Sequence, residues 1–422
     1  PKSGNELIDG LIFGFTLDPD YDFNTLLTIT FSFIDLDSVF YGGPPEEVVT
    51  STERFQEAVS EMFAEIGALL GINFVLIEET DSVVGDIRCG LYYEEGNGEG
   101  ITLGFCEVSG IVDGNLGIYT SDTGSSASNI WFNTAAFDPN NFNKGEDIYA
   151  TIVHEIGHAI GLAHPQTDVN FPLIAVDLNN YTAQSTFDYW DVDQRFIDQY
   201  IGVGDTANRL INVLDWQAYS IMSYDNYPNQ DWSNSESSYR HSDSCVCALC
   251  NGEAELATVI ATGEELAPAA FMALDIWALM YIYNYDAETD TWNIPPVNNE
   301  DTTYVINGPV FETIHDTGGV DTIDLTAFDF DIQFNLSFYG WSYDQDSNEW
   351  IFNIKHNEIG TNLLTYGDGE YTSGYILNSS PFSIIENLYL GSGNDRVSLF
   401  DPRLEVQNLV LTGGGNDEVF GV

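Results

Sequence analysis

Basic residues are scarce in this chain. Its 422 residues include 10 Lys and Arg against 67 Asp and Glu, which gives a formal net charge of −57. Nucleic acids and anionic membrane surfaces both bind basic surfaces, so we expect neither as a partner. So much charge of one sign suits a protein that works among cations, either in salt water or with bound calcium.

Long apolar runs are also missing, since none reaches the roughly 18 residues that a membrane-spanning helix requires. We therefore expect a soluble chain. Hydrophobic residues nevertheless make up 44% of the sequence, so a large core is available. At roughly 100–200 residues per domain, the length predicts two or three domains.

The texture of the sequence changes near Pro295 and Pro296. Beyond them helical periodicity is absent, and short strands punctuated by Gly, Asn and Asp run to the end. We therefore place a first domain that mixes helices and strands at 1–290 and an all-β domain at 291–422. In the first domain we expect strands at 26–34, 72–78 and 128–133 and helices at 51–70, 147–160 and 268–283.

The segment HEIGHAIGLAH, which begins at His154, holds three of the six histidines. His154 and His158 are four residues apart and share one face of a helix, where both can bind one metal ion. Gly161 lets the chain leave the helix sharply and brings His164 round as a third ligand. Three protein nitrogens leave a fourth position open, as in catalytic zinc sites, and Glu155 stands beside the first ligand as a candidate general base.

The segment SIMSYDNY at 220–227 follows further along the chain. HExxHxxGxxH with a later methionine-containing turn is typical of metzincins, and HEIGHAIGLAHP with SIMSY resembles the serralysin family of secreted zinc proteases. The resemblance implies that Met222 forms the floor beneath the zinc histidines. It also implies that Tyr224 approaches the zinc as a further ligand and swings away when substrate binds.

The resemblance covers most of the chain, from NELIDGLIFG near the start to SIIENLYLGSGND near the end. SNIWFN looks like the family's edge strand, which implies that Trp131, Phe132 and Asn133 pair with extended substrate. The implied fold is an α+β metzincin-type catalytic domain followed by an all-β calcium-binding domain, a parallel β-roll or β-sandwich.

Two glycine-rich segments, LGSGNDRVS at 390–398 and TGGGNDEVF at 412–420, match the calcium-binding repeat GGxGxDxUx. Calcium takes six to eight oxygens, so sites form between stacked turns, although GxGND also fits an ordinary tight turn. Because the sequence stops just after the second copy, we expect further repeats beyond Val422. The predicted calcium-binding residues of the two copies are Gly391, Gly393, Asp395, Gly413, Gly415 and Asp417.

A denser acidic cluster stands in HDTGGVDTIDLTAF at 315–328. The resemblance implies calcium sites here, at the start of the second domain, whereas a hairpin turn with solvated acids is the alternative. The residues implied are Asp316, Gly318, Gly319, Asp321 and Glu386, with backbone oxygens of Asn298, Glu300, Thr302 and Ile384.

Five cysteines distinguish the chain from serralysins, which have few or none. HSDSCVCALC offers one His and three Cys, which are zinc ligand types, but it also fits an oxidised loop. Disulfides are favoured for a secreted protein. We predict one between Cys89 and Cys106, and one among Cys245, Cys247 and Cys250.

The sequence thus predicts a secreted, extracellular zinc endopeptidase, implied to come from a Gram-negative bacterium, and its composition suits a saline medium. We expect one catalytic zinc, several structural calcium ions, protein or peptide substrates, a proteinaceous inhibitor, and a monomer. Glu155 takes the proton of the attacking water and passes it to the leaving amine, and Tyr224 hydrogen-bonds the oxyanion. Two rivals stay open: a calcium-dependent adhesion or toxin module with an inactive zinc site, and a non-proteolytic zinc enzyme.

Overall fold

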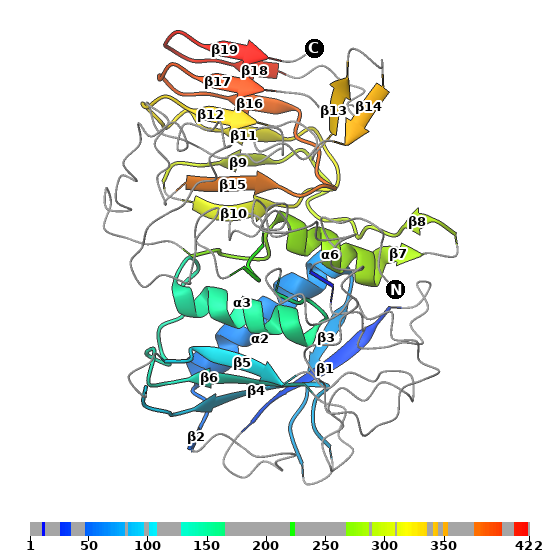
Figure 1. The fold of residues 1–422 in the computed structure, drawn as a ribbon, viewed down its shortest axis with the longest axis vertical. Coiled ribbons are helices and arrows are strands. Elements are labelled where there is room, and N and C mark those ends of the chain that lie inside the picture. The colour runs from blue at the N-terminus through cyan, green and yellow to red at the C-terminus, as the bar shows by residue number, and fades with distance from the viewer. Residues whose placement is uncertain are drawn as a thin grey trace, which may run out of the picture.

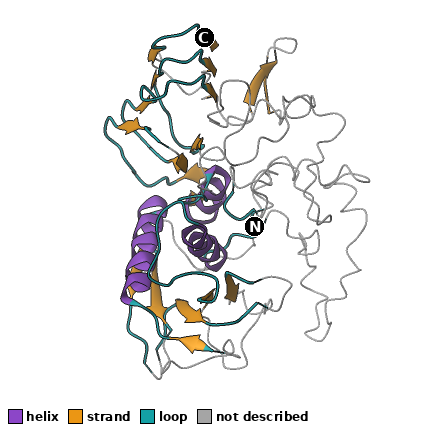
Figure 2. Cartoon of the chain, turned by 90° about the vertical axis from the view of Figure 1, so that its left-hand side faces the viewer, coloured by secondary structure: helices purple, strands orange, loops and turns teal. Residues whose placement is uncertain are grey.

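Figure 1 shows a sheet and helices at one end of the molecule and a stack of short strands at the end that carries the C-terminus; Figure 2 shows the same arrangement from the side. No described helix is both long enough and apolar enough to cross a membrane. The structure is a computed structural model, which describes residues 11–12, 26–34, 47–80, 83–96, 101–107, 128–164, 220–223, 267–286, 289–308, 310–335, 341–344, 349–352, 375–398 and 409–420.

A mostly parallel sheet of six strands forms the N-terminal region. Its order is β3-β1-β4-β6-β5, with β2 paired to β4, and β5 runs antiparallel to β6. The strands expected at 26–34, 72–78 and 128–133 are confirmed as β1, β3 and β6. The bounds are β1 (Thr28–Phe33), β2 (Val48–Val49), β3 (Asn73–Leu76), β4 (Ile87–Tyr92), β5 (Gly104–Glu107) and β6 (Ser128–Asn133).

Helix α2 (Glu53–Leu70) confirms the helix expected over 51–70. It begins where the side chain of Thr52 accepts a hydrogen bond from the amide of Phe55, and it ends at Gly71 with a φ of 67°. Its apolar stripe packs on the sheet: the ring of Phe63 stacks on that of Phe31 with centroids 4.4 Å apart. The burial of this stripe holds the helix in place.

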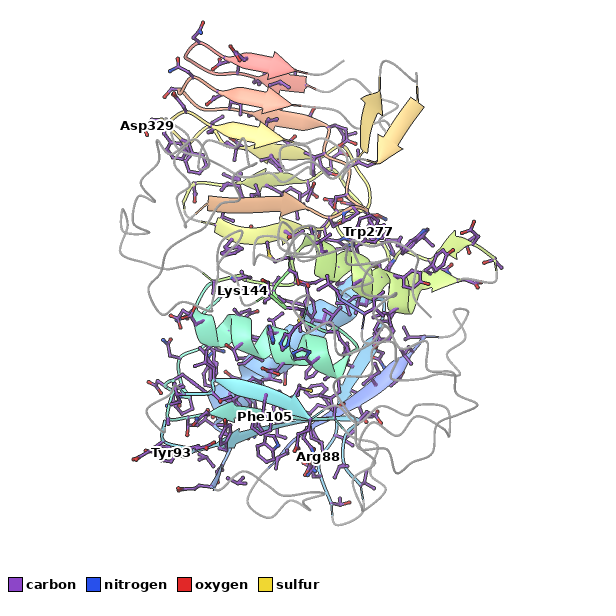
Figure 3. All side chains as sticks on the ribbon, in the orientation of Figure 1. Arg88, Tyr93, Phe105, Lys144, Trp277 and Asp329 are labelled. Carbon is purple, nitrogen blue, oxygen red and sulfur yellow. The ribbon has the colours of Figure 1, made fainter. Side chains whose placement is uncertain are left out.

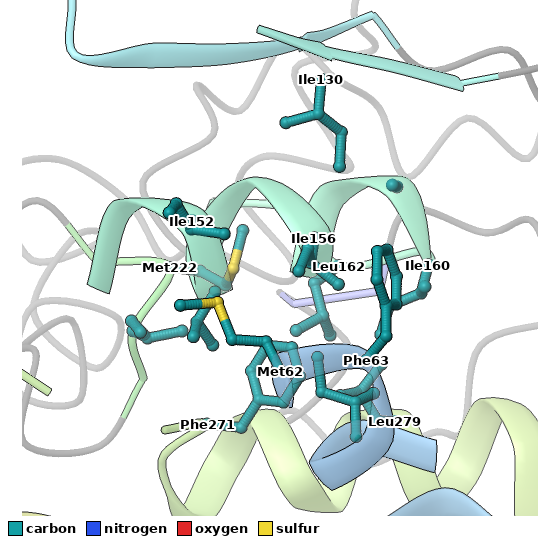
Figure 4. Packing of buried hydrophobic residues seen from close by; sticks show 14 of the residues in the cluster. Met62, Phe63, Ile130, Ile152, Ile156, Ile160, Leu162, Met222, Phe271 and Leu279 are labelled. Atoms are coloured by element: carbon teal, nitrogen blue, oxygen red, sulfur yellow. The ribbon is translucent and has the colours of Figure 1, made fainter. Parts of the chain in front are cut away.

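Helix α3 (Asp147–Ala159) confirms the helix expected over 147–160. Helix α6 (Ala273–Asn284) begins five residues later than the expected start at 268. The amide of Ala269 donates to the carbonyl of Phe311, and the amide of Met272 to Asp275 Oδ2, so these donors are used outside a helix. Figure 4 shows Met62, Ile156, Phe271 and Leu279 packed where α2, α3 and α6 meet.

The C-terminal region consists of short, largely parallel strands in layers. One sheet has the order β18-β16-β11-β9, a second β12-β17-β19 and a third β10-β15, while β7-β8 and β13-β14 are antiparallel pairs. The bounds are β7 (Tyr285–Asp286), β8 (Thr291–Trp292), β9 (Thr303–Val305), β10 (Val310–Ile314), β11 (Thr322–Asp324), β12 (Gln333–Asn335), β13 (Trp341–Asp344), β14 (Glu349–Phe352), β15 (Tyr375–Ser379), β16 (Asn387–Tyr389), β17 (Arg396–Ser398), β18 (Leu409–Leu411) and β19 (Glu418–Phe420).

Each region has its own core. The larger core joins the three helices to the sheet and includes Phe311 from β10. The smaller core consists of apolar side chains of the C-terminal region, the first of them in sequence Ile306 and the last Val397. The boundary expected between residues 290 and 291 falls inside the β7–β8 hairpin. The structure thus mixes helices with parallel sheets, and its assignment to the metzincin and β-roll types stays a prediction.

The sheet face away from α3 is closed by polar and aromatic side chains. Arg88 lies there (Figure 3), almost fully buried, and makes a bidentate ion pair with Glu79 at 2.7 and 2.8 Å. Beside it Ile34, Tyr92 and Trp131 form a small core of their own. One of the few basic residues of this chain is therefore used in a buried ion pair within the fold.

The expectation that Trp131, Phe132 and Asn133 form an edge strand is wrong. They belong to β6, which lies between β4 and β5 and pairs with both. Among the described residues, β5 is the outer strand on this side of the sheet. The order of strands depends on pairing between distant segments, and the composition of SNIWFN carries no signal of it.

The predicted disulfide between Cys89 and Cys106 is also wrong, because both thiols are free. Each cysteine pairs with Ile130, Cys89 from β4 and Cys106 from β5, so the whole of β6 stands between them. Two strand spacings amount to about 10 Å, whereas a disulfide needs Cα atoms within about 7 Å. Cys245, Cys247 and Cys250 lie outside the described residues.

Candidate metal centres

The three histidines of HEIGHAIGLAH come together at the end of α3. The helix ends at Ala159, and Gly161, with a φ of 113°, turns the chain in a conformation that a side chain disfavours. The Nε2 atom of His164 then lies 2.9 Å from the Nε2 atoms of both His154 and His158. Three potential ligand atoms lie within 4.8 Å of one another, as the spacing predicts.

Backbone carbonyls set the protonation of two of these rings. His154 Nδ1 is 2.8 Å from the carbonyl oxygen of Ile221, and His158 Nδ1 is 2.9 Å from that of Leu162. A carbonyl only accepts, so Nδ1 carries the proton in both rings and donates it. Each Nε2 is left with a lone pair that faces the other two histidines, which is the arrangement found in metal-binding histidines.

Burial keeps all three rings neutral. It lowers the pKa of His154 to about 3, of His158 to about 4 and of His164 to about 2, and repulsion between the rings adds to this for His154 and His164. Neutral imidazole is the form that binds a metal ion. At neutral pH the cluster therefore needs no deprotonation before it can accept one.

Glu155 lies beside the triad on α3 and is also buried. Burial raises the pKa of its carboxyl to about 8, and no described residue supplies it with a hydrogen bond or an ion pair. Burial, and after it repulsion from Glu155, raises the pKa of Cys106 on β5. A nearby cation would lower the pKa of Glu155 and restore a base at neutral pH.

Met222 packs directly against α3. A Cβ added to Gly157, between the first two histidines, would lie 2.8 Å from Met222 Sδ, and the Met222 side chain is fully buried. Figure 4 shows this side chain next to the helix. The structure thus places Met222 under the segment that carries the histidines, whereas Tyr224 lies outside the described residues.

The acidic cluster of the C-terminal region is buried. Asp316 is 0% exposed, Asp321 1% and Glu386 7%, and none of them makes an ion pair within the described part of the chain. Burial raises the pKa of Asp321 to about 6, and repulsion from Asp316 and Glu386 adds to the effect. Buried carboxylates without a counter-charge are strongly unfavourable, so the cluster is suited to a bound cation.

Backbone segments close around these carboxylates. The amide of Thr302 donates to Asp321 Oδ1 at 2.8 Å, and the amide of Asp321 to Glu386 Oε2 at 2.6 Å. A Cβ on Gly319, whose φ is 124°, would lie 2.6 Å from the carbonyl of Glu300. Glu300, Thr302, Gly319, Asp321 and Glu386 thus lie together, and their assignment to calcium stays a prediction. The other residues assigned to calcium in these segments are Asn298, Gly318 and Ile384.

The two glycine-rich repeats stack on one another. A Cβ on Gly413 would lie 1.8 Å from the carbonyl oxygen of Gly391, and one on Gly415 would lie 1.8 Å from that of Gly393. Only glycine permits this approach, and it lines up backbone oxygens from turn to turn. The amide of Asp395 also donates to Asp417 Oδ1 at 2.9 Å, which joins the aspartates of the two repeats.

A third turn, which the sequence motif missed, precedes the two repeats. The carbonyl oxygens of Phe328 and Phe330 face Gly391 and Gly393, and Asp331 Oδ1 accepts from the amide of Asn394 at 2.6 Å. This turn lacks glycine, and the signal that it offers is the alternation FDFD before a strand. Asp395 Oδ2, buried beside it, has no hydrogen-bond partner among the described residues, so this carboxylate oxygen could accept a cation.

Comparisons with known proteins identify no relative: no family model matches this chain, and no curated protein matches it.

Proposed function

We propose that this chain is a secreted zinc endopeptidase of the serralysin type, with a C-terminal region stabilised by calcium. The observation that carries the proposal is the convergence of three neutral imidazole Nε2 atoms next to the buried carboxyl of Glu155. Three nitrogens with a fourth position open is the donor set of catalytic zinc sites. Structural zinc sites instead use four protein ligands.

His154, His158 and His164 are the residues that would hold the ion. Zinc bound there supplies Lewis acidity, which polarises a peptide carbonyl and lowers the pKa of water. Glu155 accepts the proton of the attacking water and delivers it to the leaving amine, which needs a carboxylate close to the metal but not bound to it. Tyr224, on the family resemblance, would donate a hydrogen bond to the carbonyl oxygen as negative charge develops on it.

The outer strand β5 provides a place for an extended substrate. Among the described residues β5 pairs on one side only, with β6, so its other edge offers backbone donors and acceptors. This strand packs on α3: a Cβ on Gly104 would lie 3.2 Å from Thr151 Cγ2, one helical turn before Glu155. A polypeptide that adds to β5 as a further strand would pass the triad, which favours extended or unfolded protein substrates.

Calcium is proposed for the C-terminal region on the strength of its buried acids. Asp316, Asp321 and Glu386 need a counter-charge, and oxygen-rich turns are the surroundings that calcium prefers. The stacked repeats with Asp395 and Asp417 would hold further ions between turns. In this proposal the ions stabilise the strand stack and take no part in peptide hydrolysis.

The test is hydrolysis of unfolded casein by the full chain, with the zinc content measured in parallel. We expect activity that 1,10-phenanthroline abolishes and that added zinc restores. Glu155→Gln should keep the zinc and the fold and lower turnover on the order of a thousandfold or more. Glu61→Gln, a substitution on the exposed face of α2, serves as the matched control and should leave turnover unchanged.

Two results would contradict the proposal. A zinc-loaded chain that cleaves no protein would favour the adhesion or toxin module, or a zinc enzyme of another class. Near-normal turnover of Glu155→Gln with stoichiometric zinc would remove Glu155 from its proposed role.

A further inference from the structure

Asp275 is a fully buried carboxyl in the first turn of α6, and it belongs to none of the motifs recognised in the sequence. It accepts three hydrogen bonds. Ser220 Oγ donates to Oδ1 at 2.6 Å, and the amides of Ile221 and Met272 donate to Oδ2 at 2.7 and 2.9 Å. Two of these three donors belong to the turn that precedes Met222.

The turn that Asp275 holds is the one that orients His154. Ile221, whose amide donates to Asp275, accepts the Nδ1 proton of His154 through its carbonyl oxygen at 2.8 Å. Ser220 Oγ, which donates to Asp275, also accepts from the amide of Met222 at 3.1 Å. One buried side chain therefore fixes both the partner of a metal-binding histidine and the methionine beneath it.

The three histidines differ in how they are supported. His158 Nδ1 donates to Leu162, four residues away in the same segment, so its orientation is set locally. His154 Nδ1 donates to Ile221, which is 67 residues away in sequence. A turn so distant needs an anchor of its own, and the amide of Ile221 and the hydroxyl of Ser220 are buried donors that would lack an acceptor without Asp275.

We propose that Asp275 is a positioning residue of the metal centre, which holds the 220–223 turn so that the Ile221 carbonyl orients the His154 ring with Nε2 facing the other two histidines. This inference rests on the proposed zinc site. Residues that orient the ligands of a metal ion typically change its affinity about 10- to 100-fold when replaced. Asp275 acts through a backbone carbonyl on one ligand of three, so the lower part of that range applies.

The experiment compares zinc affinity in the wild-type chain and in Asp275→Asn by competition with a chromophoric chelator. Asparagine keeps the size of the side chain but replaces one carboxylate oxygen by an NH2 group. That group faces at least one of the three donors and cannot accept its hydrogen bond. We expect zinc binding about tenfold weaker. The visible absorption of the cobalt-substituted protein should also shift, because one ligand is rotated. Thermal unfolding shows whether the variant is folded.

Ser220→Ala is the second variant, and it keeps the inference testable if Asp275→Asn does not fold. It removes one of the three bonds to Asp275 and should weaken zinc binding several-fold, with a smaller spectral shift. A matched control is Asp147→Asn in the first turn of α3, which should leave both readouts unchanged.

The outcomes separate the inference from the proposed function. If the wild-type chain binds no zinc, the proposed function fails and the inference falls with it. If the wild-type chain binds zinc and both variants match its affinity and its cobalt spectrum, Asp275 has only a structural role and the inference alone is overturned. If both variants lose affinity while Asp147→Asn does not, the positioning role stands.

Discussion

The two candidate metal centres of this chain are assembled in opposite ways. The histidines lie within one short segment on α3 and its exit, their Nε2 atoms already converge, and two of them are oriented by backbone carbonyls. The acids of the C-terminal region come from segments far apart in sequence and lie buried together, and no described residue forms an ion pair with them. Backbone hydrogen bonds orient the histidines of the first centre, whereas the second centre brings together carboxylates that repel one another.

The difference follows from what surrounds each centre. The histidine segment is embedded in the larger core, and neutral imidazoles add no charge to it. The acidic segments belong to a small core between short strands, where the burial of carboxylates opposes folding. Ion binding should therefore contribute mainly chemistry at the first centre and mainly folding free energy at the second.

Calcium removal should have the largest effect. Binding to the native state alone stabilises by mass action, about 4 kcal/mol when the free ion exceeds its dissociation constant a thousandfold. We expect a calcium chelator, with zinc resupplied, to lower the unfolding temperature of the C-terminal region by about 10 °C or more. Removal of zinc by 1,10-phenanthroline should shift the N-terminal transition far less. Differential scanning calorimetry with metal analysis measures both.

High salt provides the control for this experiment. Molar sodium chloride screens the repulsion between Asp316, Asp321 and Glu386, so it should restore part of the lost stability but not all of it. A monovalent ion does not replace a coordinated divalent one. An unchanged unfolding profile after measured loss of calcium would show that the acidic cluster is not a calcium site.

Two alanine substitutions should sharpen the comparison. At Gly393 a Cβ would lie 2.1 Å from the backbone oxygen of Phe330, so we expect Gly393→Ala to destabilise the C-terminal region by about 4 kcal/mol or more. At Gly157 the nearest atom is the flexible side-chain sulfur of Met222 at 2.8 Å, so Gly157→Ala should cost about 1–3 kcal/mol. Chemical denaturation followed by circular dichroism gives both values.

Gly308→Ala is the matched control for this pair. It lies in the same region as Gly393, and nothing stands within 4 Å of its added Cβ, so its stability should match that of the wild-type chain. Equal losses for Gly157→Ala and Gly393→Ala would mean that the strand stack is as adaptable as the helical core. The contrast drawn between the two centres would then be wrong.

The parts of the molecule that could be predicted from sequence are those with local causes. The spacing of His154 and His158 on one helix, and of Gly161 before His164, depends only on helix geometry and on glycine, and the structure brings the three together. The helix starts and stops near Thr52 and Gly71 follow from capping in the same way. Each of these features is decided within a few residues of the chain.

The features that sequence reasoning missed depend on contacts between distant segments. Because β6 lies between β4 and β5, the Cys89–Cys106 bond cannot form, and the outer strand is β5 rather than the strand that contains Trp131. Asp275 bonds to the 220–223 turn only because α6 packs beside it. A single acid in the apolar run PAAFMALDIWALM does indicate a buried carboxyl that needs hydrogen-bond donors, but not which donors. Strand order and buried polar partners leave little trace in local patterns.

Tyr224→Phe should have the smallest effect. Three imidazoles suffice to hold a zinc ion, so the loss of the hydroxyl should leave the zinc content unchanged, in contrast to the acidic centre, where each oxygen contributes to holding calcium. The phenol is expected to assist only as negative charge develops on the carbonyl oxygen, so turnover should fall about tenfold, equivalent to about 1.4 kcal/mol.

KM should change little, because the hydroxyl contributes mainly in the transition state. Steady-state casein hydrolysis with zinc analysis tests this, and Tyr285→Phe, a half-buried tyrosine bonded to Asp290, is the control. Loss of zinc in Tyr224→Phe would instead make Tyr224 a structural ligand. The histidine centre would then need a fourth protein ligand to hold its ion, and it would resemble the acidic centre, where several oxygens hold the ion together.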